Sequence, residues 1–164
     1  MSIHARHKLN RFLASMSDSR LVLNERDSCS FKCTNGMRCI VELIPNSTAV
    51  LVYFPLKRLP DSLATRVATL EQALSMNLSL QQSNGATIVL DERLKQLTLS
   101  AQRELETCSF EEFDSWLGKL IQRSQRAQEE LDRFELPKAL KAKSKGPSVS
   151  PLNQAIQNSV LLKI

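Results

Sequence analysis

The sequence predicts an α+β fold, with elements in the order α-β-β-β-α-β-β-α and a twisted antiparallel sheet. Three observations support it: an amphipathic stripe near the N-terminus, five short strand-like runs divided three and two by one helical segment, and a long helical stripe after them. A sheet of this kind has too few helices to cover both faces and needs a partner. We therefore expect a binding module that works through apolar surface, without a catalytic cluster.

The first helix is predicted near the N-terminus, where one apolar stripe recurs at positions i, i+3, i+4 and i+7. It should end near residues 17–19. A short strand is predicted at residues 20–24, with the sequence RLVLN, followed by a polar stretch that leads to Phe31. The stripe of the helix consists of Leu9, Phe12, Leu13 and Met16.

The next two strands are predicted at residues 37–44 and 48–54, joined by a hairpin at residues 45–47. Asn35-Gly36 precedes them and predicts a type I′ hairpin turn, because both central residues of that turn need positive φ. Both strands are apolar at nearly every position, so both faces of this sheet are expected to be covered.

The second helix is predicted at residues 62–78, with Asp61 as its N-cap. Its apolar spacing of four, three and four suits packing against a sheet and also packing against a second helix, and the sequence leaves the two alternatives open. The residues of this stripe are Leu63, Val67, Leu70 and Leu74.

A second hairpin is predicted from strands at residues 86–90 and 94–101, with a turn at residues 91–93. In its second strand Leu97 and Leu99 alternate with polar residues, as in a half-exposed strand.

The third helix is predicted to run from Ser109 to about Arg133. Ser109 and Glu112 have the S-x-x-E spacing of a capping box, in which each residue bonds the backbone amide of the other. Trp116 is expected at the edge of the core. The apolar stripe comprises Phe110, Phe113, Leu117, Leu120, Ile121 and Leu131.

The formal net charge of +5 is concentrated at the C-terminus. Residues 1–133 hold 17 Lys and Arg against 16 Asp and Glu, whereas residues 134–164 hold 5 against 1. A domain near neutrality, without aromatic residues among its cations, is a poor candidate for nucleic-acid binding. The sequence has no apolar run of membrane-spanning length and no signal-peptide pattern, so we expect a cytosolic protein without a membrane partner.

The cysteines and histidines do not form a recognisable site. His4 and His7 lie far from the cysteines in sequence, so we expect no zinc site and reduced, partly buried thiols. The sequence also lacks the phosphate-binding patterns GxxxxGK[ST] and GxGxxG, a nucleophile elbow and paired carboxylates, so we expect no catalytic residue and no cofactor. None of the four cysteines belongs to a CxxC pair: Cys29, Cys33, Cys39 and Cys108.

The composition changes after residue 135. Residues 136–151 combine three prolines, a glycine and four lysines with few apolar residues, which predicts a linker after a domain of residues 1–135. Residues 152–164 regain apolar content and suit either a helix or an added strand. Two alternatives stay open for them: a peptide that binds this protein or a partner, and a frayed end.

Four stretches within residues 3–133 carry a family resemblance: LNRFLASM, RCIVELIPNSTAVLVYF, GATIVLDERLKQLTLSAQ and SFEEFDSWLGKLIQ. With the element order, they resemble the class I type III secretion chaperones, the CesT/Tir chaperone family. The resemblance implies a small bacterial cytosolic protein that forms a homodimer and has no enzymatic activity. It also implies binding of the N-terminal segment of one or more secreted effectors in extended form, and leaves open a contact with the secretion ATPase.

The resemblance implies two sets of site residues. In the family, the second helix and the strand after it build the dimer interface, which here corresponds to Leu63, Val67, Leu70, Leu74, Ile88 and Leu90. The effector-binding grooves lie on the first helix and neighbouring strands, with the last hairpin as a weaker candidate. The corresponding residues are Leu9, Phe12, Leu13, Met16, Leu21, Leu23, Leu97 and Leu99.

Two features depart from the family pattern: the pI near 9.2 and the C-terminal extension. They motivate the hypothesis that residues 152–164 occupy an effector groove until a client displaces them. They also motivate an alternative function, a regulatory or nucleic-acid-associated protein whose binding falls steeply with salt. In this alternative, the positively charged C-terminal segment would bind through Lys138, Lys141, Lys143 and Lys145.

Overall fold

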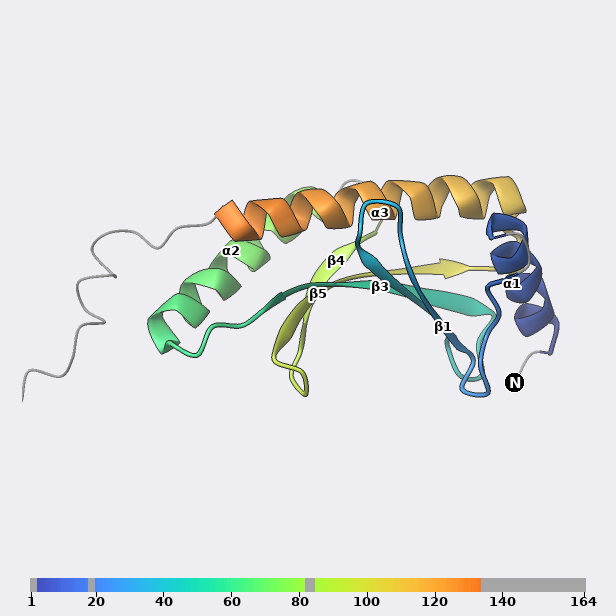
Figure 1. The fold of residues 1–164 in the computed structure, drawn as a ribbon, viewed down its shortest axis with the longest axis horizontal. Coiled ribbons are helices and arrows are strands. Elements are labelled where there is room, and N and C mark those ends of the chain that lie inside the picture. Colours follow the sequence, from blue (N-terminus) through green and yellow to red (C-terminus); the bar gives the residue numbers. More distant parts are fainter. Residues whose placement is uncertain (1–2, 18–19, 82–84, 134–164) are drawn as a thin grey trace, which may run out of the picture. The chain divides into compact units, whose positions relative to one another are not determined.

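The computed structural model describes residues 3–17, 20–81 and 85–133, and the fold of this part is the expected α+β class (Figure 1). The predicted linker and C-terminal segment lie outside the described residues. The elements are α1 (Ile3–Met16), β1 (Ser28–Lys32), β2 (Arg38–Leu43), β3 (Ala49–Arg58), α2 (Leu63–Gln81), β4 (Thr87–Asp91), β5 (Gln96–Glu104) and α3 (Phe110–Arg133).

The strands form one antiparallel sheet in the order β1-β2-β3-β5-β4. The β3–β5 pair has a register shift between Pro55 and Lys57. Such an irregularity accommodates proline, which cannot donate a hydrogen bond to the neighbouring strand. β3 therefore continues through Pro55 to Arg58, beyond its predicted end at residue 54.

The helices gather on one side of the sheet. Figure 1 shows α3 crossing this side, with α1 near its N-terminal end and α2 near its C-terminal end. The apolar stripes of α1 and α3 face the sheet, as their spacing predicts, and form the core with alternate strand residues. Its fully buried members include Leu9, Leu13, Val41, Val50, Phe54, Leu99, Phe113 and Leu117.

The expectation that both faces of the sheet are covered is wrong for the described residues. In β3, Val52 and Phe54 point into the core and are fully buried, whereas Leu51 and Tyr53 point to the other face and are half-buried. The strands are apolar on both faces, but the described helices pack on one of them. The second face is therefore left partly open to solvent.

The predicted strand at residues 20–24 is not formed, and the first strand is β1. Side chains of the first helical segment take the backbone amides that a strand would use: Leu23 N–H donates to Asn10 Oδ1 at 2.8 Å and Leu21 N–H to Ser17 Oγ at 3.0 Å. A segment held in this way cannot pair regularly with a neighbouring strand.

Asn35-Gly36 lies in a hairpin turn, as predicted, but this turn joins β2 to β1, a strand that the sequence did not predict, and it is not of type I′. Gly36 has φ of 86°, whereas Asn35 is not among the described residues with positive φ. Gly36 N–H donates to the Cys33 carbonyl at 2.9 Å, so the central residues of the turn are Thr34 and Asn35. Gly36 follows the turn in the left-handed region, which glycine adopts without strain.

The predicted capping box of α3 is confirmed. Ser109 N–H donates to Glu112 Oε2 at 2.8 Å, and Glu112 N–H donates to Ser109 Oγ at 3.2 Å. The predicted N-cap of α2 is off by one residue, because the Ser62 carbonyl accepts the first helical hydrogen bond, from Arg66 N–H at 2.9 Å. Ser62 therefore holds the N-cap position, and Asp61 precedes it.

Candidate binding surfaces

The open face of the sheet carries a shallow, mostly apolar groove of about 290 Å³. Side chains alternate along a strand, so the outward residues of β2, β3, β4 and β5 meet on this face, together with the β4–β5 turn. The apolar residues that line the groove are Ile40, Leu51, Pro55, Val89, Leu90 and Leu94.

The polar part of the groove is negatively charged. Tyr53 donates a hydrogen bond from its hydroxyl to Glu42 Oε2 at 3.2 Å. Burial raises the pKa of Tyr53, with a further contribution from the Glu42 charge, so the hydroxyl stays protonated near neutral pH. Asp91 supplies a second carboxylate, and none of the described residues that line the groove is Lys or Arg.

A second apolar surface lies on α2. We define the α2 face as Leu63, Val67, Leu74 and Leu78, whose side chains are 72%, 45%, 68% and 74% exposed. Their spacing places them on one side of the helix. The opposite side buries Ala68, Ala73 and Met76, so α2 packs mainly with small residues and exposes large ones.

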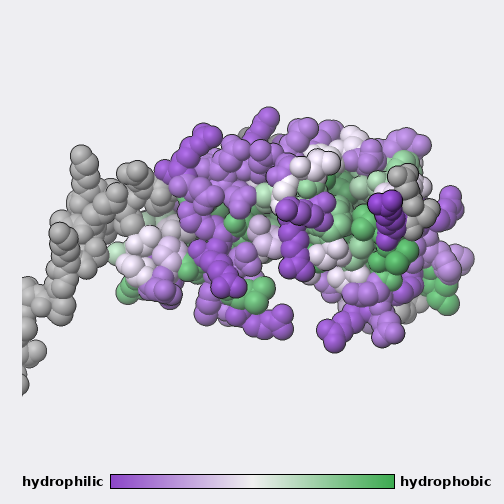
Figure 2. All heavy atoms as spheres, viewed as in Figure 1, coloured by the Kyte–Doolittle hydropathy of each residue, from purple (hydrophilic) through white to green (hydrophobic). Residues whose placement is uncertain are grey.

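The two apolar surfaces contrast with the outer side of α3. Figure 2 shows hydrophilic residues along α3, and hydrophobic residues reaching the surface near the start of α2 and near the β4–β5 turn. Contiguous exposed apolar residues of this kind mark interaction sites more often than scattered ones do.

Asn77 attaches α2 to the edge strand β4. Its Nδ2 donates to the Ile88 carbonyl at 3.0 Å, and its Oδ1 accepts from Ile88 N–H at 2.6 Å. These two bonds satisfy main-chain groups of a strand that, among the described strands, has a neighbour on one side only. They also hold α2 in the orientation that turns the α2 face to solvent.

The predicted dimer-interface residues divide into accessible and buried groups. Leu63, Val67, Leu74 and Leu90 are exposed, and Leu70 is half-buried. Ile88 lies opposite Leu99 in the sheet and is 5% exposed, so it belongs to the core of its own chain. The structure thus brings most of this set to the surface but removes Ile88 from it.

The predicted effector-binding residues do not come together on a surface. Met16 and Leu21 are half-buried and pack against the core. The other six are between 0% and 6% exposed and belong to the core: Leu9, Phe12, Leu13, Leu23, Leu97 and Leu99. For the three on α1, the reason is that the helix turns its stripe toward α3 and the sheet. In the described structure these six have almost no side-chain surface for a partner.

Sequence reasoning missed Leu78 and the residues of the open groove other than Leu90, which it had assigned to the dimer interface. A signal for the groove exists in residues 49–56, which are apolar at both odd and even positions. Odd and even positions face opposite sides of the sheet, and a core on one side needs only one of the two sets to be apolar. Leu78 lies four residues after Leu74 and continues the spacing of the second helix.

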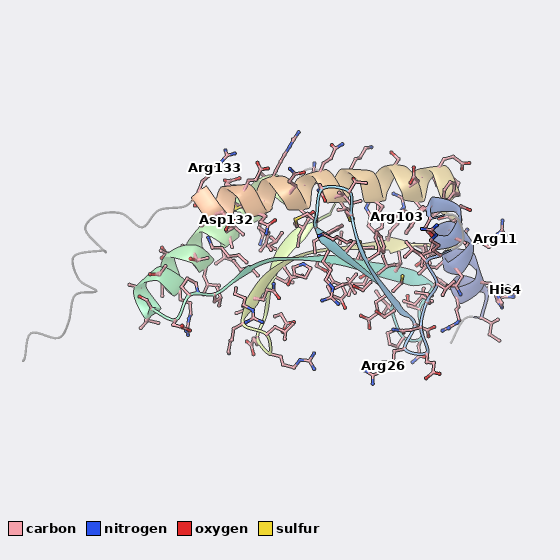
Figure 3. All side chains as sticks on the ribbon, viewed as in Figure 1. His4, Arg11, Arg26, Arg103, Asp132 and Arg133 are labelled. Atoms are coloured by element: carbon pink, nitrogen blue, oxygen red, sulfur yellow. The ribbon has the colours of Figure 1, made fainter. Side chains whose placement is uncertain are left out.

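The histidines lie outside both surfaces. His4 and His7 are exposed on α1, and Figure 3 shows His4 and Arg11 projecting away from the sheet. Within residues 3–17, 20–81 and 85–133, no three His, Cys, Asp or Glu side chains are placed to hold a metal ion. The helices of this part are too short or too polar to cross a membrane.

Comparison with known proteins identifies a family. The model of the Tir chaperone protein (CesT) family matches residues 7–128. No curated protein matches the chain by sequence.

Solved structures share the fold at low sequence identity. The ExsC–ExsE complex is 20% identical, with a TM-score of 0.63 over 80% of this chain and 97% of that chain. The HopA1–SchA chaperone–effector complex is 17% identical, with a TM-score of 0.60 over 79% and 98%. The heterodimeric ExoU–SpcU complex from the type III secretion system of Pseudomonas aeruginosa is 16% identical, with a TM-score of 0.57 over 77% and 99%.

These matches confirm the resemblance and the fold class that the sequence predicts. With a family match over residues 7–128 and the same fold in several solved complexes, the chain belongs to the Tir chaperone protein (CesT) family.

Proposed function

We propose that this chain is a type III secretion chaperone without enzymatic activity. It forms a homodimer, binds the N-terminal segment of one or more secreted effectors in extended form, and keeps them secretion-competent in the bacterial cytosol. Family membership supports this role, and one similar structure is itself a chaperone–effector complex. The observation that carries the proposal is the apolar groove on the open face of the sheet.

The groove has the chemistry to hold an unfolded segment. An extended chain presents side chains to alternate sides, so its apolar residues can cover Ile40, Leu51 and Val89. Its backbone groups can form their hydrogen bonds with partners outside the groove. The carboxylates of Glu42 and Asp91 favour a segment that carries Lys or Arg beside these apolar residues. Many weak apolar contacts can bind a client and still allow its removal. Neither step requires an ATP site in the chaperone.

The α2 face supports self-association. Its four aliphatic residues are spaced for packing against another helix, and a second copy of the same helix supplies a complementary surface in a two-fold dimer. Leu90, on the strand after α2, is also exposed and belongs to the same proposed interface.

A binding experiment with the full chain tests the groove. Val89→Lys and Leu94→Lys change side chains that are 42% and 49% exposed, so the fold should tolerate both. We expect each to weaken, at least tenfold, the binding of the N-terminal fragment that co-purifies with the wild type, measured by calorimetry. Val22→Lys is the matched control, because Val22 is 58% exposed and does not line the groove. Unchanged affinity in both groove variants would contradict the proposed site.

A separate experiment tests the dimer. Light scattering after size exclusion should give about twice 18.5 kDa for the wild type. Leu74→Glu combined with Leu78→Glu should give the mass of one chain, because two buried carboxylates per copy oppose burial of the α2 face. Ile3→Glu, at a residue 70% exposed on α1, should leave the dimer intact. A double variant that remains dimeric would place the interface elsewhere.

A further inference from the structure

The β1–β2 hairpin places three cysteines on one face of the sheet. Phe31 lies opposite Cys39, and Cys29 lies opposite Val41. Cys33 N–H donates to the Met37 carbonyl at 2.8 Å, so Cys33 extends the same ladder. Because side chains alternate along each strand, Cys33 and Cys39 point to the same face as diagonal neighbours across the hairpin.

The two thiols lie on the same face of the hairpin but differ in their surroundings. Cys39 is fully buried, whereas Cys33 is half-buried next to the turn. Interaction with the Cys39 thiol lowers the pKa of Cys33, against a smaller opposing effect of burial. The same interaction, together with burial, raises the pKa of Cys39. Cys33 is thus both the more accessible thiol and the more readily ionised one, the combination that makes a cysteine reactive.

We propose that Cys33 and Cys39 form a peroxide-sensitive pair, in which Cys33 is oxidised first and Cys39 then closes an intramolecular disulfide. In the first step the Cys33 thiolate attacks a peroxide oxygen and the O–O bond breaks. One proton is taken up, leaving a sulfenic acid and water. In the second step the Cys39 sulfur displaces the sulfenic oxygen, which leaves as water with the Cys39 proton, and the S–S bond forms.

The position of the pair in the sheet permits this closure. Diagonal neighbours in a sheet have Cα atoms about 7 to 8 Å apart, and a disulfide spans up to about 6.8 Å, so the hairpin must tighten slightly. β1 lies at the edge of the sheet and pairs with β2 alone among the described strands. Such a strand can shift toward its one neighbour without breaking a second ladder.

Cys29 provides the internal comparison. It is also a diagonal neighbour of Cys39. It is, however, 7% exposed, and burial raises its pKa. If proximity to Cys39 alone decided which cysteine pairs with it, Cys29 would compete with Cys33. If solvent access and ionisation of the thiol decide it, Cys33 reacts.

Peptide mapping of the full chain tests the proposal. The reduced protein is treated with hydrogen peroxide, the remaining thiols are blocked with iodoacetamide, and linked peptides are identified by mass spectrometry with and without dithiothreitol. We expect a Cys33–Cys39 link that dithiothreitol removes. Cys33→Ser should abolish it, Cys39→Ser should leave a sulfenic acid at Cys33 that dimedone traps, and Cys29→Ser should form the link as the wild type does.

Three results in the wild type would overturn the pair. They are a Cys29–Cys39 link in place of the expected one, sulfinic acid at Cys33 with Cys39 still free, and no reaction of either thiol at peroxide concentrations that oxidise a reactive cysteine. The peptide map of the wild type tests the Cys33–Cys39 link by itself. The test therefore stays decisive even where a serine variant fails to fold.

Discussion

At the scale of one residue, Leu13 shows that one apolar spacing is compatible with two roles, in a core or in a binding groove. Its spacing with Leu9 and Phe12 predicts an apolar helix face, and that face is equally suited to a core or to a binding groove. In the structure Leu13 is fully buried between α1 and the rest of the core. Its first contribution is therefore to stability.

We expect Leu13→Ala to lower the free energy of unfolding by about 2 to 5 kcal/mol, since it leaves a cavity in a close-packed core. Val22→Ala, at a residue 58% exposed on the following segment, should change it by less than about 0.5 kcal/mol. Urea unfolding followed by circular dichroism measures both. A Leu13→Ala protein as stable as the wild type would show that this residue does not serve the core.

At the scale of elements, α2 depends on few large inward contacts. Ala68, Ala73 and Met76 bury its inner side, and Asn77 adds two hydrogen bonds to the main chain of Ile88. The position of the α2 face thus rests partly on one amide side chain.

We expect Asn77→Ala to lower the free energy of unfolding by about 1 to 3 kcal/mol, because it leaves two main-chain groups without their partner. Hydrogen exchange at the Ile88 amide should become faster than in the wild type. Glu71→Ala, at an exposed position of the same helix, is the control and should leave this amide protected. Equal exchange rates in both variants would contradict the attachment.

At the scale of the whole molecule, charge and apolar surface are separated along the sequence. Residues 1–133 are near neutrality and carry both apolar surfaces, whereas residues 134–164 hold 5 Lys and Arg against 1 Asp or Glu. The family match falls within the first part. This separation favours the chaperone over the nucleic-acid-associated alternative, because the matched part lacks the excess positive charge that phosphate binding needs.

We expect replacement of Lys138, Lys141, Lys143 and Lys145 by Gln to leave effector affinity and dimer mass unchanged. Any nucleic acid retained at low salt should be lost, since its binding depends on neutralising phosphates. Calorimetry, light scattering and the absorbance ratio of the purified protein at 260 and 280 nm measure the three properties. If effector binding were lost instead, the lysines would belong to the client site.

Much of the fold is predictable from local rules. The element order, the positions of the three hairpin turns and the α3 capping box follow from periodicity, turn residues and the Ser109–Glu112 spacing. The segment at residues 20–24 could not be predicted in this way, because side chains of Asn10 and Ser17 take its amides. Such acceptors come from a neighbouring helical segment and leave no trace in the strand-like pattern of the segment itself.

The sequence by itself determined which residues are apolar and, for most of them, on which helix or strand they lie. Only the tertiary structure decided which of these residues face solvent: Leu9 and Leu99 are fully buried, whereas Leu63 and Leu74 are 72% and 68% exposed. A stripe buried within its own chain and a stripe reserved for a partner have the same local spacing. They differ in which surface packs over them, and that depends on contacts between elements far apart in the sequence.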